Sequence, residues 1–242
     1  MPNHAAGMVD PAIFEHLQEK IDEDVTFRDA LRDIVQQLEK QTRTAQAILS
    51  RAHSTPSAQT SDVVRAAEAA IRDEITTVAG LSVQASKQPY YKWNDVWTRK
   101  MQDVCQTILF CGWLNGFAQV GQDGAGKLLT IEEVGGVLNV PVNLKDSDAF
   151  HLTIEEYLLA LVSLIEELAR LARNSVTLGD FRRPLQISQF IKDVHAGFSI
   201  LNLKNDILRK RVDGIKYRVK EVEDVVYDLS LRDLLPKDEE HT

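Results

Sequence analysis

Apolar side chains recur every three or four residues along most of the chain, and the alternation typical of strands is almost absent. Prolines, which begin or end helices, separate the periodic stretches at positions 11, 56, 89, 141, 184 and 236. The pattern predicts an all-α fold of seven helices. The expected ranges are about 10 to 51, 62 to 87, 90 to 120, 130 to 141, 153 to 174, 185 to 201 and 205 to 233.

Capping residues mark three of the predicted helix starts. Asp10 precedes Pro11, and proline is favoured at the first helical position. The other two starts carry capping boxes, formed by Thr130 with Glu133 and by Thr153 with Glu156. At about 1.5 Å per residue the first helix is a rod of roughly 60 Å, which a compact monomer cannot bury. We therefore expect an elongated bundle that assembles into a closed oligomer.

No stretch of the chain has the composition of an interdomain linker. Residues 10–235 are therefore expected to form a single all-helical domain. The first nine residues and the charged tail, residues 236–242, are expected to be disordered.

The last predicted helix has the most regular apolar pattern. It forms an unbroken series with alternating steps of three and four, made of Leu208, Val212, Ile215, Val219, Val222, Val226 and Leu229. Such a seam is typical either of a face inside one bundle or of a helix that pairs between subunits. Val219, Val222 and Val226 are the candidate residues for a seam between subunits.

Composition and charge limit the functions that the chain can have. With 44% hydrophobic residues it has enough apolar material for a core, so disorder is excluded as its main state. Its net charge of -8 excludes a generally basic nucleic-acid coat. A nucleic-acid site must therefore be a local patch.

Two local patches combine the residue types that such a site needs. The segment from Tyr90 to Lys100 holds four aromatic residues together with Lys92, Arg99 and Lys100. There the lysines and the arginine are candidates to hold phosphates and Trp93 to stack a base, although both tryptophans of the segment also suit a bundle core. Residues 204–220 carry a net charge of +5, so Arg209, Lys210 and Arg211 form a secondary basic patch for phosphates or for an acidic partner subunit.

Several other classes of protein are disfavoured. The uncharged span from Val104 to Gln122 is long enough for a membrane helix, but its glutamines, asparagine and glycines argue against one, so no membrane association is expected. The first residues lack a secretory signal pattern, which favours a cytoplasmic and also a nuclear location. Cys105 and Cys111 are expected to be buried, reduced thiols.

Motifs for enzyme chemistry are weak. The loop from Gly121 to Lys127 resembles a phosphate-binding loop but has Leu128 in place of Ser or Thr and follows a helix. No spacing of His and Cys predicts zinc, and no nucleophile motif is present. Glu167 lies in an apolar helical turn, where pairing with Arg170 is favoured over catalysis. We therefore expect neither a bound metal nor a cofactor.

Several segments between about residues 11 and 234 resemble one known family. The C-terminal region, from Asn174 to Arg232, carries the most specific resemblance. Four earlier segments match in order: IFEHLQEKIDED, VQQLEKQTR, PYYKWNDVWTRK and FHLTIEEYLLALV. On these segments the chain resembles the translin family. The resemblance implies a seven-helix fold, ring-like or barrel-like octamers, and binding of single-stranded RNA and DNA. It also implies a partner, the related translin-associated factor X (TRAX), in a hetero-octameric ribonuclease as an alternative to the homo-octamer.

The resemblance also bears on catalysis, since TRAX supplies four magnesium-binding acidic positions. On this chain those positions fall on Asp103, Gln106, Ser163 and Glu167, so only two acidic side chains remain. This places the chain on the non-catalytic side of the complex.

Two basic segments linked to nucleic-acid binding in the family are thin in charge here. The first keeps only Arg65 and Arg72, and the second keeps Lys92. The leading hypothesis is a single-strand-binding scaffold subunit that supports a TRAX-containing ribonuclease in small-RNA or tRNA-fragment processing. Two alternatives stay open: a magnesium-dependent ribonuclease that acts alone through Asp103 and Glu167, and a helical scaffold without nucleic-acid binding.

Overall fold

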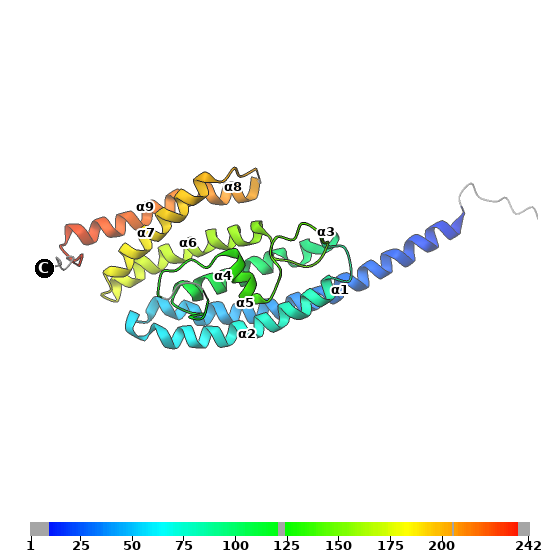
Figure 1. Ribbon diagram of the computed structural model, residues 1–242, viewed down its shortest axis with the longest axis horizontal. Coiled ribbons are helices and arrows are strands. Elements are labelled where there is room, and N and C mark those ends of the chain that lie inside the picture. The colour runs from blue at the N-terminus through cyan, green and yellow to red at the C-terminus, as the bar shows by residue number, and fades with distance from the viewer. Residues whose placement is uncertain (1–9, 121–123, 205, 237–242) are drawn as a thin grey trace, which may run out of the picture.

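The computed structural model describes residues 10–120, 124–204 and 206–236, and within these ranges every regular element is a helix. The all-α prediction is confirmed. Apart from Pro236, the segments expected to be disordered lie outside the described residues. The helices stack in layers to form an elongated bundle (Figure 1).

The first two helices form a long antiparallel pair. The helix α1 spans Pro11–Leu49, and α2 spans Thr60–Ala85 after two short 3-10 turns. The predicted cap is present, because the Asp10 carboxylate accepts a hydrogen bond of 3.0 Å from the Ala12 amide. The first third of α1 extends beyond the rest of the bundle (Figure 1).

The third predicted helix, about 90 to 120, is corrected by the structure. It is divided into α3 (Tyr90–Trp93), a 3-10 turn (Asn94–Val96) and α4 (Thr98–Trp113). The helix ends early because Asn115 adopts a left-handed conformation, with φ of 77°, and the Gly116 amide donates to the Cys111 carbonyl over 2.8 Å.

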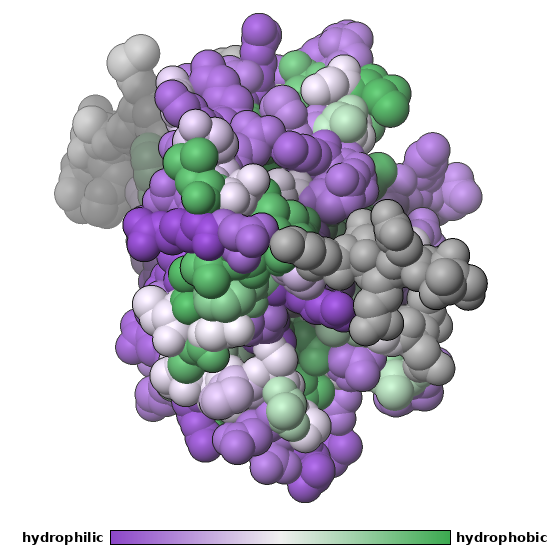
Figure 2. Space-filling view, turned by 90° about the vertical axis from the view of Figure 1, so that its left-hand side faces the viewer, coloured by the Kyte–Doolittle hydropathy of each residue, from purple (hydrophilic) through white to green (hydrophobic). Residues whose placement is uncertain are grey.

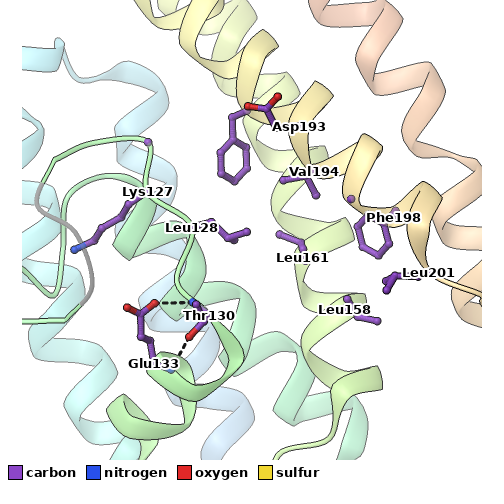
Figure 3. A pocket seen from close by; sticks show the side chains of 13 residues that line it. Lys127, Leu128, Thr130, Glu133, Leu158, Leu161, Asp193, Val194, Phe198 and Leu201 are labelled. Atoms are coloured by element: carbon purple, nitrogen blue, oxygen red, sulfur yellow. Dashed lines mark hydrogen bonds between the residues drawn. The ribbon is translucent and has the colours of Figure 1, made fainter.

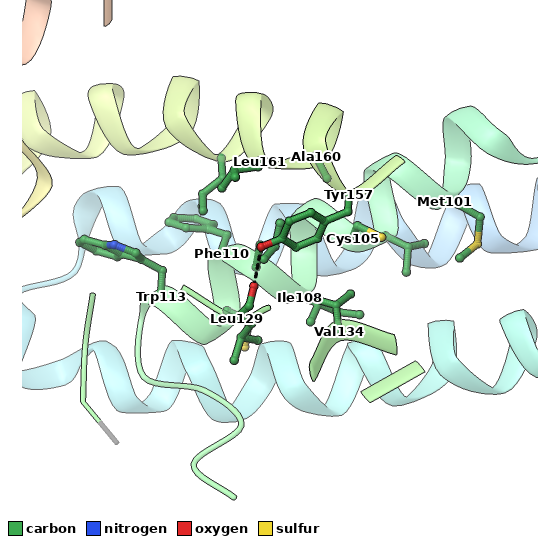
Figure 4. Packing of buried hydrophobic residues seen from close by; sticks show 14 of the residues in the cluster. Met101, Cys105, Ile108, Phe110, Trp113, Leu129, Val134, Tyr157, Ala160 and Leu161 are labelled. Carbon is green, nitrogen blue, oxygen red and sulfur yellow. Dashed lines mark hydrogen bonds between the residues drawn. The ribbon is translucent and has the colours of Figure 1, made fainter. Parts of the chain in front are cut away.

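The middle helices begin where the capping boxes predicted. The helices α5 (Ile131–Leu138) and α6 (Ile154–Thr177) both have reciprocal side-chain caps, which confirms both starts and assigns Glu133 and Glu156 a structural role. The next helix, α7, spans Arg182–Ile200. In the core, α4, α5 and α6 pack together, and the Tyr157 hydroxyl donates to the Leu129 carbonyl over 2.8 Å (Figure 4).

The seventh predicted helix is also divided. Gly214 separates α8 (Asp206–Asp213) from α9 (Ile215–Leu231), so the described residues contain nine α-helices in place of seven. The helix α9 packs on α6 and α7 of its own chain, and α8 packs on α6.

This packing decides where the apolar seam of the last helix lies. The seam residues Leu208, Ile215, Val222 and Leu229 are buried inside the subunit. Val219 and Val226 are partly buried. For Val222 the assignment to a seam between subunits is therefore wrong, because the bundle of the same chain already covers it. For Val219 and Val226, which keep part of their surface exposed, the assignment stays a prediction.

The two cysteines lie in the core. Cys105 and Cys111 are both free and buried, and burial raises the pKa of each thiol, so the expectation of reduced thiols is confirmed. Among the described helices none combines the length and hydropathy needed to cross a membrane.

Exposed apolar side chains are distributed unevenly. At the end of the bundle that carries the C-terminus, one apolar band lies among mostly hydrophilic side chains (Figure 2). The projecting part of α1 differs, because Ile13, Phe14, Leu17, Ile21 and Val25 are all 48% to 64% exposed. A single subunit therefore leaves a substantial apolar surface uncovered at that tip.

Candidate functional site

A small polar pocket lies between α1, α4 and α6. It has a volume of about 240 Å³ and is lined by Gln46, Leu49, Ser50, Gln106, Phe110, Glu167 and Arg170. Helical spacing explains how the polar residues meet. Gln106 and Phe110 are one turn apart on α4, and Glu167 and Arg170 are neighbours on α6, so each pair points from one face of its helix.

Glu167 is held by partners from two directions. His53, from the 3-10 turn after α1, places its Nε2 2.6 Å from Glu167 Oε1, and Arg170 lies 3.8 Å from the same oxygen. The predicted pairing with Arg170 is therefore present, but the buried His53 is the closer partner. The hydrogen bond from His53 and the charge of Arg170 hold the pKa of Glu167 below its usual value.

The ring of His53 is itself oriented by a second side chain. The Asn174 amide nitrogen lies 3.0 Å from His53 Nδ1 and donates to it. With that nitrogen as acceptor, the neutral ring carries its proton on Nε2 and donates it to Glu167. Sequence reasoning missed this arrangement, because His53 and Glu167 are 114 residues apart and His53 belongs to no motif.

The other acidic position, Asp103, lies outside the pocket lining. Its carboxylate is 3.5 Å from the ammonium of Lys100, which also lies 3.3 Å from Glu39 of α1. The hydrogen bond from Lys100 lowers the pKa of Glu39. The two remaining carboxylates of the four TRAX-type positions are thus each paired with cationic or hydrogen-bonding side chains.

The two neutral positions have also acquired partners. Gln106 Oε1 accepts a hydrogen bond of 3.5 Å from Gln46, and Ser163 Oγ accepts one of 3.2 Å from Arg211 of α8. Magnesium needs several oxygen ligands in a near-octahedral arrangement. The described residues contain no cluster of three or more His, Cys, Asp or Glu side chains that could hold a metal ion. The side chains at these positions therefore do not fit a TRAX-type magnesium site.

The structure places Trp93 in the core. Its side chain is 1% exposed, and its ring packs against Phe27 with centroids 5.1 Å apart. Arg28 and Lys92 place their cationic groups 5.0 and 4.9 Å from the ring centroid. The base-stacking assignment of Trp93 is therefore wrong, since no open ring face remains.

The predicted basic residues do not form one patch. Arg65 and Arg72 lie on the exposed side of α2, whereas Lys92 belongs to α3 and Lys100 to α4. Lys92 pairs with Asp24 over 2.6 Å, and Lys100 lies within ion-pair distance of Glu39 and Asp103. Arg99 is exposed at the start of α4.

The secondary basic patch lies on α8, in the outer layer of the bundle. Arg211 pairs with Glu166 over 3.5 Å. Arg209 and Lys210 are exposed, and no acidic side chain that the structure describes lies within ion-pair distance of either. Positive charge is therefore most available on this helix.

The glycine-rich loop before α5 has no feature of a nucleotide site in its described part. Residues 121–123 lie outside the described residues. The Lys127 ammonium, the counterpart of a phosphate-binding lysine, donates instead to the carbonyls of Phe117 and Val120 over 3.2 and 3.0 Å. Lys127 therefore stabilises the loop.

The fold and the site together define a class: an elongated helical-bundle subunit with an uncovered apolar helix tip and, among its described residues, a polar pocket without a metal-binding set. The Translin family model matches residues 26–233. Translin of Gallus gallus is 37% identical over 227 residues, covering 92% of this chain and 93% of the relative. Translin of Homo sapiens is 37% identical over 224 residues, covering 91% and 92%. The chain belongs to the translin family.

More distant similarities agree with this assignment. Translin-associated protein X of Pongo abelii is 26% identical over 170 residues, which cover 67% of this chain and 58% of the relative. Among solved structures, apo-NeC3PO superposes with a TM-score of 0.65 at 11% identity, covering 91% of this chain and 98% of that one. A complex of AfC3PO with duplex RNA gives the same TM-score and coverage at 14% identity. These structures share the fold.

Proposed function

We propose that this chain is a non-catalytic scaffold subunit that binds single-stranded RNA and DNA, forms octamers and supports a TRAX-containing ribonuclease. One observation carries the non-catalytic part. At the four positions where TRAX is expected to hold magnesium, two side chains are neutral and the two carboxylates have other partners. Membership of the translin family supports the assembly and the TRAX-type partner.

The pairing of the carboxylates matters as much as their number. A magnesium ion at Glu167 would compete with both the His53 hydrogen bond and the Arg170 charge. At Asp103 it would compete with the Lys100 ammonium. Because Gln106 and Ser163 supply no additional acidic ligands to offset this competition, the site disfavours a divalent cation.

A cleavage assay tests the non-catalytic assignment. We expect the purified chain to bind a labelled single-stranded RNA and to leave it uncut with magnesium, whereas addition of a TRAX-type subunit yields cleavage. The decisive controls are Asp103→Asn and Glu167→Gln, which remove charge and retain size. Magnesium-dependent cleavage by the chain alone that either variant abolishes, with helicity unchanged, would establish the alternative of a stand-alone ribonuclease.

Arg99 is the basic residue of the first patch that is best placed to contact a phosphate, because it is exposed and lies between Lys92 and Lys100 in sequence. We expect Arg99→Ala to lower the affinity for single-stranded RNA several-fold. The slope of log affinity against log salt should fall by about 0.7, the value for one phosphate contact to a single strand. Filter binding at four salt concentrations measures both quantities.

The matched control is Lys192→Ala on α7. It removes an exposed cation that pairs with Glu223 of α9 over 2.8 Å, away from the helix that carries Arg99. We expect it to leave the slope unchanged. An unchanged slope in Arg99→Ala would remove this residue from the interface. Complete absence of binding by the octamer would support the helical scaffold without a nucleic-acid role.

A further inference from the structure

The projecting part of α1 is an amphipathic helix that no other described helix of its own chain covers. Phe14, Leu17, Ile21 and Val25 recur at helical spacing, and Ile13 widens the stripe. The segment points away from the bundle, beyond the reach of the other helices drawn (Figure 1). A lone helix of about 15 residues is marginal in water, and its stability therefore depends on packing.

This segment is also strongly acidic. Residues 10–25 contain six Asp or Glu residues and one lysine, a net charge of -5. Glu15 and Asp22 flank one edge of the apolar stripe, because they are two turns apart and directly follow Phe14 and Ile21 around the helix. A partner for this helix needs an apolar surface with basic residues beside it.

The junction of α7 and α8 offers such a surface, which we define as the α7–α8 surface. Its apolar members are Ile200, Leu201 and Ile207, which are 85%, 44% and 66% exposed. Its basic members are Lys204, Arg209, Lys210 and Lys216, all exposed. The net charge of +5 over residues 204–220 matches the acidic segment in size and is opposite in sign.

Two hollows flank this surface and can receive large side chains. One, of about 580 Å³, lies between α6, α7 and the segment before α5, where Leu128, Leu158, Leu161, Val194, Phe198 and Leu201 surround it (Figure 3). The other, of about 370 Å³, is lined by residues that include Phe198, Leu203, Arg209 and Lys216. Phe198 and Leu201 line both hollows, so the two form adjoining parts of one apolar region.

We propose that residues 11–25 of one copy dock on the α7–α8 surface of a second copy, so that the apolar stripe fills the hollows and the flanking acids meet Arg209 and Lys210. The proposal rests on the oligomer of the proposed function and assigns the surfaces that build it. If two copies are related by a two-fold axis, each docks its residues 11–25 on the other, so the pair contains this contact twice.

A nucleic acid on the same basic residues is the competing occupant. It would neutralise Arg209 and Lys210 but would leave Ile200, Leu201 and Ile207 in water, and it would leave the α1 stripe uncovered. Docking of the acidic helix satisfies the charged and the apolar parts of both surfaces together. The geometry therefore favours the second copy of this chain.

Light scattering on the full-length chain without nucleic acid tests the proposal. We expect the double variant Leu17→Asp, Ile21→Asp to shift the mass from the assembled form toward smaller species, down to the 27.2 kDa subunit. Helicity and the thermal midpoint of the bundle should persist, because Leu17 and Ile21 are about half exposed and are not members of the buried core. The control Ala12→Asp adds a charge on the opposite side of the same helix, at an exposed position, and should leave the mass unchanged.

A charge exchange gives a second, independent test. Glu15→Lys with Asp22→Lys should weaken assembly, Arg209→Glu with Lys210→Glu should weaken it similarly, and the combination of all four should restore it at least partly. Assembled mass in every variant, with lowered RNA affinity for the Arg209 and Lys210 changes, would overturn the docking and assign the surface to nucleic acid. A wild-type chain that is monomeric at micromolar concentration would contradict the proposed octamer itself, a result distinct from failure of this interface.

Discussion

Val222→Asp should unfold the subunit and should not merely dissociate the oligomer. Val222 is fully buried where α9 packs on α6 and α7. An aspartate there has no cationic partner built into the core, so the substitution costs about 4 kcal/mol or more, a large part of the stability of a typical domain. We expect loss of most of the cooperative urea transition at 25 °C, measured by circular dichroism together with the mass in solution.

Two further variants separate burial from helix effects. Val222→Ala keeps the site apolar and should cost on the order of 2 kcal/mol, with the assembled mass retained. Tyr217→Asp introduces the same charge on the same helix at a side chain that is 66% exposed, and should change stability by about 0.5 kcal/mol or less. A folded, monomeric Val222→Asp protein with native helicity would contradict the intramolecular position of the seam.

The stability of the subunit should fall as pH rises from about 4.5 to about 8, because of a carboxyl group buried in the bundle. Glu74 of α2 is completely buried, and desolvation raises the pKa of its side chain to about 8. The folded state then keeps a proton that the unfolded state releases above pH 4.5. This difference lowers the free energy of unfolding by about 1.4 kcal/mol per pH unit across that window.

Two threonine hydroxyls lie close to Glu74, and their hydrogen bonds to the charged carboxylate lower its pKa by less than desolvation raises it. Thr107 Oγ1 lies 3.0 Å from Glu74 Oε2 and 2.7 Å from the Val104 carbonyl oxygen. A hydroxyl has a single proton, and the carbonyl can only accept it, so Thr107 is free to accept the proton of a protonated Glu74. Thr42 likewise donates its hydroxyl proton to the Leu38 carbonyl over 2.9 Å.

Glu74→Gln provides the test. The amide keeps the size of the side chain and a donor for Thr107 but does not titrate, so the pH dependence of the urea midpoint between pH 5 and 8 should become much flatter. Asp73→Asn, at the exposed neighbouring position of the same helix, is the control and should retain the wild-type slope. A wild-type chain whose stability does not decrease over this range would contradict the buried neutral carboxyl.

Much of the fold could be predicted because the relevant interactions are local. The caps at Asp10, Thr130 and Thr153 join residues two or three positions apart, and the chain fixes their spacing before any tertiary contact forms. The helical period of apolar residues is local in the same sense. For the candidate site, the family resemblance located the four positions, and the residue types there indicated that Gln106 and Ser163 cannot act as acidic ligands.

The sequence by itself determined that the chain is helical, where most helices start, which faces are apolar and how charge is distributed. Only the tertiary structure decided what covers each face. It buried the last helix's seam within the subunit, enclosed Trp93 behind Phe27, and brought His53 to Glu167 across 114 residues. The physical reason is that an apolar stripe specifies burial but not a partner, since the hydrophobic effect is non-directional and the partner is chosen by shape and charge between distant segments.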